Sequence, residues 1–182
     1  MEKENLTEQE RRFLLNLAGS AIESELEGRP FTLPMVTNSR LLEHQGAFVT
    51  IHIRGRLRGC IGTFTADKPL YETIADMALS AAFRDPRFPP LTPSEFKDID
   101  IEISVLSPMK LISEINEIEI GTHGIYIVNG PWRGVLLPQV ATEHGWDQTT
   151  FLDQTCIKAG LAPGCWKDPE TRIYIFSAEI FH

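Results

Sequence analysis

The segment that decides the fold is residues 47–62, which read AFVTIHIRGRLRGCIG. Apolar residues occupy every second position from Ala47 to Ile53, so they share one face of a predicted strand. Gly55 offers a turn, and residues 56–64 are predicted to return as the partner strand. The segment therefore predicts a β-hairpin, and the second strand of that hairpin carries the unusual residues of the chain.

Helical patterns lie on both sides of this hairpin. Capping boxes at Thr7 and at Thr92, each with a glutamate three residues later, predict two helix starts. Apolar residues at helical spacing continue the first helix up to Gly28. Proline at the first turn and an apolar stripe predict another helix from Pro69 to Phe83.

Further strands are predicted in the second half of the chain. The alternation over residues 99–105 is typical of a half-exposed strand in an antiparallel sheet. Residues 124–137 predict a second hairpin around the pair Asn129-Gly130, and residues 172–181 predict a final strand. Short helices are predicted to begin at Pro138 and at Asp147.

The order of these elements indicates the fold class. Strands joined by short turns, without regular alternation with long helices, favour an α+β fold of mainly antiparallel sheets with flanking helices. A length of 182 residues predicts a single domain over 1–182. Groups of helix and strand at both ends would allow two lobes packed as one compact unit, with no boundary marked in the sequence.

The charge balance restricts the partners. The chain has 17 Lys+Arg and 25 Asp+Glu, a net charge of −8, which argues against bulk binding of nucleic acid. No apolar run approaches the length of a membrane span, and the acidic start lacks the features of a secretory signal. Three cysteines are then best interpreted as reduced thiols, and we expect a cytoplasmic protein.

The chemistry of the second strand singles out one site. If this strand is extended, Arg56, Arg58 and Cys60 project to one side, while Gly59 and Gly62 let a ligand or another backbone approach closely. Guanidinium groups nearby favour the thiolate form of a cysteine, so Cys60 is a candidate nucleophile. The two arginines are candidate ligands for a small carboxylate or phosphate.

Structural interpretations of the same residues remain open. Cys60 can be a buried packing residue, the glycines can mark a bulge, and the arginines can lie on a solvated face. Glu143, beside His144, is a weaker candidate acid or base, because adjacent exposed charges are usually only solvated. Asp85 with Arg87 is best interpreted as an internal ion pair that fixes a loop.

Metal and cofactor templates are absent from the sequence. It contains no HExxH, CxxC, Walker or GxSxG motif, so neither a metal site nor a cofactor is expected. Cys156 and Cys165 lie nine residues apart, which fits no tight zinc knuckle, and Cys156 is predicted to be a core residue.

The hexapeptide LRGCIG at residues 57–62 resembles the signature of the AMMECR domain family. Further blocks that resemble the family are AAFRDPRF at 81–88, EISVL at 102–106, LPQV at 137–140 and KAGL at 158–161, together with Glu143 and Trp146. They cover nearly the whole chain in order. The chain is therefore identified as a member of this family, in a form similar to the prokaryotic AmmeMemoRadiSam system proteins.

The resemblance implies an α+β fold of two unequal subdomains with the hexapeptide near a cleft between them. It also implies two partners, a Memo-like protein and a radical S-adenosylmethionine protein. No reaction is established for the family, so the resemblance leaves open whether the chain is an enzyme.

Two hypotheses follow. In the first, a cleft around LRGCIG binds a small anionic substrate or modified group, with Cys60 as nucleophile, Arg56 and Arg58 as anion ligands and Glu143 as reserve acid or base. In the second, the protein is a non-catalytic interaction module, LRGCIG is a structural turn, and the surface around Phe88 or Trp132 docks a partner.

Overall fold

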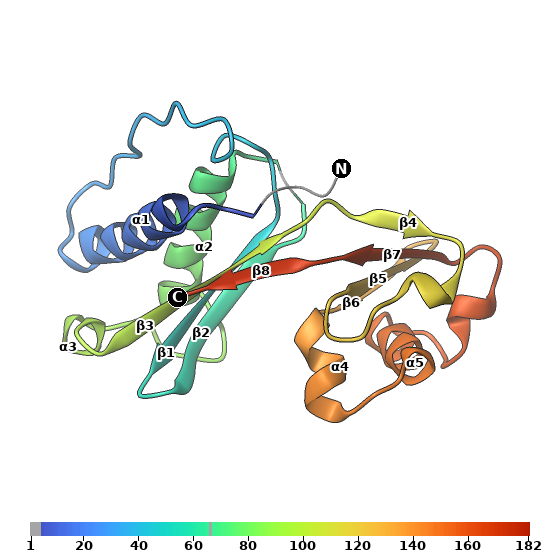
Figure 1. The fold of residues 1–182 in the computed structure, drawn as a ribbon. Helices are drawn as coiled ribbons and strands as arrows, with labels where there is room; N and C mark the ends of the chain where they lie inside the picture. The colour runs from blue at the N-terminus through green and yellow to red at the C-terminus, as the bar shows by residue number, and fades with distance from the viewer. Residues whose placement is uncertain (1–4, 66) are drawn as a thin grey trace. The chain divides into compact units, whose positions relative to one another are not determined.

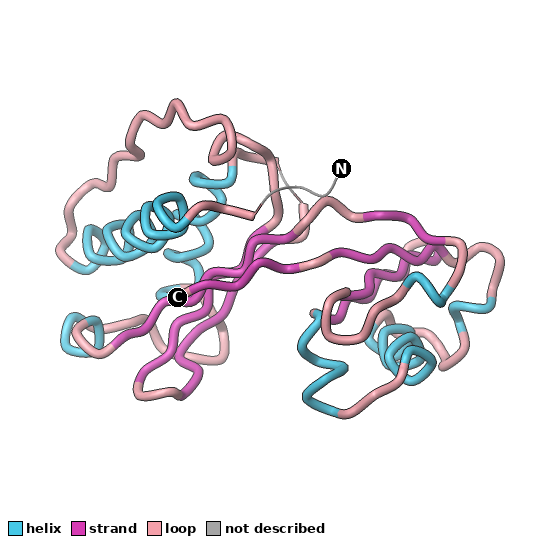
Figure 2. Tube along the Cα trace, in the orientation of Figure 1, coloured by secondary structure: helices cyan, strands magenta, loops and turns pink. Residues whose placement is uncertain are grey.

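The computed structural model describes residues 5–65 and 67–182 (Figures 1 and 2). The chain divides into two compact units. Unit 1 contains Met1–Leu106 and Glu179–His182, and unit 2 contains Ser107–Ala178. In the described part of the chain, no helix is both long enough and apolar enough to span a membrane.

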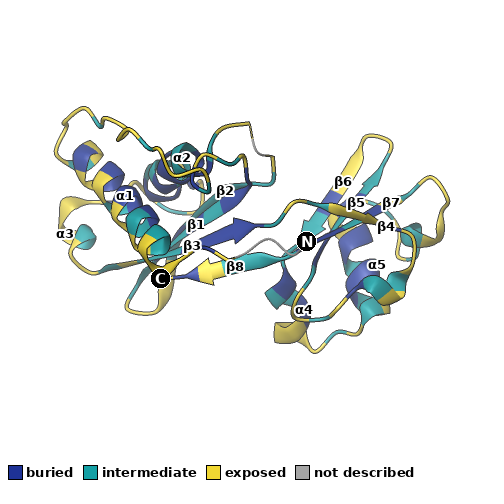
Figure 3. Ribbon diagram, turned by 45° about the horizontal axis from the view of Figure 1, so that its top comes forward, coloured by how far each residue is buried: buried dark blue, intermediate teal, exposed yellow. Residues whose placement is uncertain are grey.

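Unit 1 is built on a four-stranded sheet in the order β2-β1-β3-β8. Helices α1 and α2 pack against this sheet and against each other. Helix α1 is buried on one side and exposed on the other, whereas the residues of α2 are buried or half-buried (Figure 3). The elements are α1 (Glu8–Leu26), β1 (Ala47–Ile53), β2 (Arg56–Thr63), α2 (Leu70–Phe83), α3 (Pro93–Phe96), β3 (Ile99–Leu106) and β8 (Ala178–Phe181).

The β1–β2 hairpin forms as predicted. Arg54 and Gly55 both have positive φ angles, 51° and 74°, as a two-residue turn between antiparallel strands requires. Val49 and Ile51 of β1 are fully buried in the core beneath the helices, together with Ile103 of β3. The alternate residues of β1 point to the other face of the sheet and are only half-buried.

Unit 2 is built on a second antiparallel sheet in the order β4-β7-β5-β6, with a core of its own. Helix α5 packs on β5 and β6. The elements are β4 (Lys110–Ile112), η1 (Ile115–Glu117), β5 (Gly124–Asn129), β6 (Trp132–Leu136), α4 (Pro138–His144), α5 (Gln148–Lys158), η2 (Cys165–Lys167) and β7 (Arg172–Phe176). The predicted α+β fold with antiparallel sheets is therefore confirmed.

The final strand was predicted wrongly as one element. Residues 172–181 form two strands that belong to different sheets, β7 and β8, and Ser177 separates them. The main chain of Ser177 forms hydrogen bonds with Ser107 in place of ladder bonds to a neighbouring strand. The Ser177 N–H donates to Ser107 Oγ at 2.9 Å, and the Ser177 C=O accepts from the Ser107 N–H at 2.9 Å. These bonds interrupt the pairing where the chain passes from one sheet to the other.

The expectation of three reduced thiols was also wrong. Cys156 at the end of α5 and Cys165 in η2 form a disulfide, and Cys60 is the free cysteine of the described residues. Gly160 and Gly164 adopt positive φ angles that turn the chain back after α5, which brings the two Cα atoms within 5.8 Å. Cys156 is fully buried, as predicted for a core residue.

Candidate functional site

The LRGCIG motif lies in β2, the edge strand of the unit 1 sheet. The ladder pairs Ile51 with Gly59 but His52 with Leu57, so Arg58 is an extra residue, a β-bulge. Because a bulge resets the alternation of side chains, the residues on its two sides do not keep the predicted pattern.

The bulge separates the residues that the sequence placed together. Cys60 lies opposite Thr50, and Arg56 lies opposite Ile53. Residues directly opposite share a face, and Thr50 and Ile53 are three positions apart, so Arg56 and Cys60 point to opposite faces of the sheet. The prediction that Arg56, Arg58 and Cys60 project to one side was therefore wrong.

Arg58 is held by an internal ion pair. Its Nε and Nη2 donate to the two carboxylate oxygens of Glu95 at 2.9 and 3.1 Å, and its side chain is only 11% exposed. The guanidinium carbon also lies 5.9 Å from the centroid of the Phe88 ring. Hydrogen bonds from Arg58 lower the pKa of Glu95 to about 2. Nε and Nη2 of Arg58 are thus already engaged inside the protein, whereas its Nη1 is buried and has no hydrogen-bond partner among the described residues.

Both glycines of the motif serve internal packing. A Cβ atom on Gly59 would lie 2.1 Å from the carbonyl oxygen of Ala81, so the strand approaches α2 as closely as only glycine allows. A Cβ atom on Gly62 would lie 2.2 Å from the ring of Phe48. Close approach of another part of the protein is therefore seen at both glycines, and the bulge that the structural interpretation allowed lies next to Gly59, at Arg58.

The main chain of Cys60 is clamped by the loop that follows α2. Its N–H donates to Asp85 Oδ2 at 2.9 Å, and its C=O accepts from Arg87 Nη2 at 3.2 Å. Asp85 and Arg87 form the predicted ion pair, with an N–O distance of 2.7 Å. Hydrogen bonds from Arg87 hold the pKa of the buried Asp85 carboxyl far below its ordinary value. The loop thus satisfies the polar groups of an edge strand at one residue.

The side chain of Cys60 lies on the face of the sheet that points away from the core. Cys60 is half-buried, and its Sγ accepts a hydrogen bond from Thr50 Oγ1 at 3.2 Å. Thr50 also lies opposite Glu102 of β3 in the ladder. A thiol, a hydroxyl and a carboxylate thus follow one another across three strands, all on this face.

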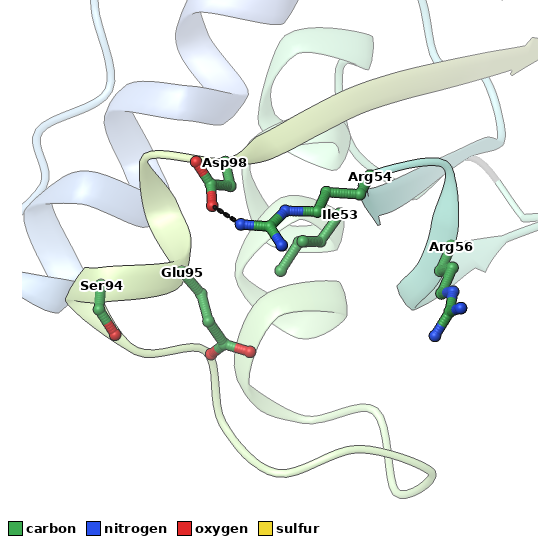
Figure 4. Close-up of a pocket in the computed structure, with 6 residues that line it drawn as sticks. All are labelled: Ile53, Arg54, Arg56, Ser94, Glu95 and Asp98. Carbon is green, nitrogen blue, oxygen red and sulfur yellow. Dashed lines mark hydrogen bonds and ion pairs between the residues drawn. The ribbon is translucent and has the colours of Figure 1, made fainter.

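Arg56 lies at a different feature, a shallow depression of about 550 Å³ beside the tip of the hairpin. Ile53, Arg54 and Arg56 line it from the hairpin side, and Ser94, Glu95 and Asp98 from α3 and the turn after it (Figure 4).

Glu143, the reserve acid or base, lies on α4 in unit 2 and is exposed. The imidazole of His144 stacks on Trp146 with ring centroids 4.6 Å apart. A joint site of Glu143 with Cys60 stays a prediction, because the two residues belong to different units. Among residues 5–65 and 67–182, no cluster of three or more His, Cys, Asp or Glu side chains could hold a metal ion.

The sequence missed the contacts that complete the site. Asp85 was recognised as the partner of Arg87, but its bond to Cys60 spans 25 positions. Glu95 was recognised as a helix-capping residue, and its second role, the pair with Arg58, spans 37 positions. The position of Thr50 beside the thiol follows from the register of the hairpin. That register can be predicted only if the position of the bulge is known.

Comparisons with known proteins agree with this architecture. A protein of Methanothermobacter thermautotrophicus is 46% identical over 97% of this chain and 96% of its own length. One of Nanoarchaeum equitans is 43% identical over 92% of this chain and 97% of its own length. The crystal structure of the uncharacterised protein PH0010 from Pyrococcus horikoshii matches with a TM-score of 0.82 at 42% identity, covering 92% of this chain and 88% of that one. The AMMECR1 family model matches residues 15–181, and the chain therefore belongs to the AMMECR1 family.

Proposed function

We propose that the protein binds a small anionic substrate or modified group beside Cys60 and that the Cys60 thiol attacks it. The observation that carries this proposal is the asymmetry of Cys60. Its main-chain N–H and C=O are bonded to the ion pair of Asp85 and Arg87, while the residue is only half-buried and its side chain lies on the face of the sheet away from the core. A nucleophile must be both fixed and accessible, and Cys60 combines the two.

The anion preference is assigned to Arg87. Among the described residues, its side-chain hydrogen bonds use Nε and Nη2, which leaves the N–H groups of Nη1 for a ligand. Its side chain is half-exposed beside the cysteine peptide. Arg58, by contrast, binds Glu95 through Nε and Nη2, and its unpartnered Nη1 is buried, while Arg56 points to the opposite face of the sheet. Arg87 thus takes the role that the sequence gave to those two arginines.

The simplest balanced step is transfer of an acyl group to sulfur. The Cys60 Sγ forms a bond to the acyl carbon while the bond from that carbon to the leaving group breaks. The leaving group takes the electron pair of the broken bond and the proton released by the thiol, so no oxidant or reductant is consumed. Water then hydrolyses the thioester and regenerates the thiol.

Thiol labelling tests whether Cys60 is available. The native protein is treated with iodoacetamide, and mass spectrometry locates the adduct. We expect Cys60 to be labelled under native conditions, with no adduct in a Cys60→Ser variant. Labelling that occurs only after denaturation would mean a packed thiol and would end the proposal.

A functional test then uses Cys60→Ala in the source organism, with Leu57→Ala as the matched control on the same strand. Loss of function with normal folding in the first variant, and retention in the second, supports thiol chemistry. Full function of Cys60→Ala excludes a nucleophilic role.

The family resemblance supports a pathway shared with a Memo-like protein and a radical S-adenosylmethionine protein, in the cytoplasm. We propose that this pathway supplies or consumes the substrate of this protein. Co-purification of tagged protein with these two partners at native expression levels, absent from a tag-only control, is the expected result.

A second candidate function is that of an interaction module. Its supporting observation is the exposure of apolar side chains: Leu57, on the same face as Cys60, is 42% exposed, and Trp132 in unit 2 is 51% exposed. Leu57→Asp and Cys60→Ser separate the two functions. A module loses function with the first variant and keeps it with the second, whereas an enzyme that uses the thiol loses function with the second.

A further inference from the structure

The depression beside the hairpin tip has walls of opposite charge. Arg54 and Arg56 supply the hairpin wall, and Glu95 and Asp98 supply the wall formed by α3 and its following turn, with Ser94 beside them. Figure 4 shows Ile53 between the two walls. Because Arg56 and Cys60 lie on opposite faces of the sheet, this depression is separate from the thiol site. Its volume of about 550 Å³ is in the range of small-molecule sites.

The guanidinium groups of the cationic wall are available to bind a ligand. No hydrogen bond or ion pair joins the guanidinium of Arg56 to another of the described residues, and the residue is exposed. Arg54 reaches across to Asp98, but the pair is 3.4 Å apart and the two side chains are 84% and 51% exposed. Such an exposed, long contact is weak and is easily exchanged for a better partner.

The anionic wall offers one carboxylate. Glu95 is already bonded by Arg58 and by the N–H and hydroxyl of Thr92. Within the described part of the chain, the carboxylate of Asp98 has only its long contact with Arg54. A ligand ammonium group would therefore bind Asp98, and a ligand carboxylate would bind Arg56, or Arg54 once that residue is released.

We propose that this depression binds a small zwitterion, an α-amino acid with an aliphatic side chain. A ligand that is only anionic would lie beside two carboxylates, and a ligand that is only cationic would lie beside two guanidinium groups. A zwitterion matches both walls, and Ile53 provides the apolar surface for its side chain. The site does not depend on Cys60 or on the function proposed above.

Three related probes test this match. L-Leucine carries both charges, N-acetyl-L-leucine only the negative one and L-leucinamide only the positive one. Each is titrated to about 20 mM into the isotope-labelled full chain, and amide shifts are followed by NMR; open, solvated charge pairs imply dissociation constants on the order of millimolar. Leucine is expected to bind most tightly and to shift the amides of residues 53–56 and 94–98.

Variants assign the two walls. Arg56→Gln should weaken leucine binding about fivefold and leave leucinamide unchanged, while Asp98→Asn should weaken both. Arg84→Gln, an exposed arginine at the end of α2, is the control and should change neither. Cys60→Ser should also leave leucine binding intact, which separates this site from the thiol site. Equal binding of leucine and N-acetyl-leucine, or no shift with leucine, overturns the proposal.

Discussion

The carboxylate of Asp85 accepts a hydrogen bond from the main-chain N–H of Cys60 at 2.9 Å across 25 positions of sequence. The same carboxylate accepts three bonds from Arg87, from its main-chain N–H, Nε and Nη2, at 3.1, 2.9 and 2.7 Å. A buried aspartate is tolerable here because every bond it makes favours the ionised form. It connects the loop after α2 to the edge of the sheet at the residue that carries the thiol.

Replacing Asp85 by alanine should destabilise unit 1. The change leaves the Cys60 N–H without its acceptor and Arg87 without its counterion, and we expect a loss of about 2–4 kcal/mol in the free energy of unfolding. Asp85→Asn keeps one acceptor oxygen and should lose roughly half as much. Urea unfolding followed by far-UV circular dichroism measures both.

The matched control is Asp100→Asn, an exposed carboxylate on β3 that should change stability by less than about 0.5 kcal/mol. An Asp85→Ala variant as stable as this control would mean that the loop is held by other contacts.

Gly59 should tolerate no side chain. In Gly59→Ala the new Cβ would lie 2.1 Å from the Ala81 carbonyl oxygen, which is backbone, so strand and helix must move apart. We expect a loss of about 3 kcal/mol. Gly19→Ala in the middle of α1 is the opposite case, because its Cβ meets only Ile101 Cδ1 at 3.9 Å. That variant should gain about 0.5–1 kcal/mol, and an equal effect of the two substitutions on the unfolding midpoint would contradict this account.

Local signals explain why the secondary structure could be predicted. The capping box of Thr7 and Glu10 closes within one helical turn, with the Thr7 N–H donating to Glu10 at 2.7 Å, and Thr92 with Glu95 repeats it. The turn at Gly55 is likewise decided by adjacent residues. Contacts of this kind lie within three or four positions, where sequence pattern and structure are tied directly.

The candidate site was less predictable because its geometry depends on distant packing. The bulge at Arg58 arises where Gly59 meets α2 and where Glu95 receives the displaced side chain, and neither partner is visible from the strand alone. The disulfide was missed because two glycine turns, at 160 and 164, bring Cys165 back to Cys156. An odd number of cysteines pointed away from any pairing.

Stability should fall at acid pH through the ion pair of Arg58 and Glu95. The folded-state pKa of Glu95, lowered to about 2 by hydrogen bonds from Arg58, lies below its ordinary value of 4.5. The stabilisation is therefore complete above about pH 4.5 and is lost as the pH falls toward 2. Because the carboxylate is about one third exposed, we expect only about 1–2 kcal/mol from this pair.

Unfolding free energies measured from pH 6 to pH 2 check this expectation. Glu95→Gln cannot ionise, so its stability should fall less steeply over the same range, and the two curves should converge at the acid end. Parallel curves would assign the acid loss to other carboxylates, such as Asp85, whose pKa lies lower still.

The disulfide should stabilise unit 2, and tryptophan fluorescence can follow the unfolding of this unit. Cys156 and Cys165 close a loop of nine positions, for which loop entropy predicts about 2–3 kcal/mol. All three tryptophans, Trp132, Trp146 and Trp166, lie in unit 2. Tryptophan fluorescence during urea unfolding should therefore shift to a lower midpoint when dithiothreitol is added.

Two variants separate this effect from general reduction. Cys165→Ser should unfold at the lower midpoint with or without dithiothreitol, whereas Cys60→Ser should respond as the parent chain does, because Cys60 takes no part in the bond. Trp166, whose Nε1 donates to Asp153 at 2.8 Å next to the disulfide, gives the local signal. A parent chain with one midpoint in both buffers would mean that the Asp153 contacts, rather than the cystine, hold the end of α5 against η2.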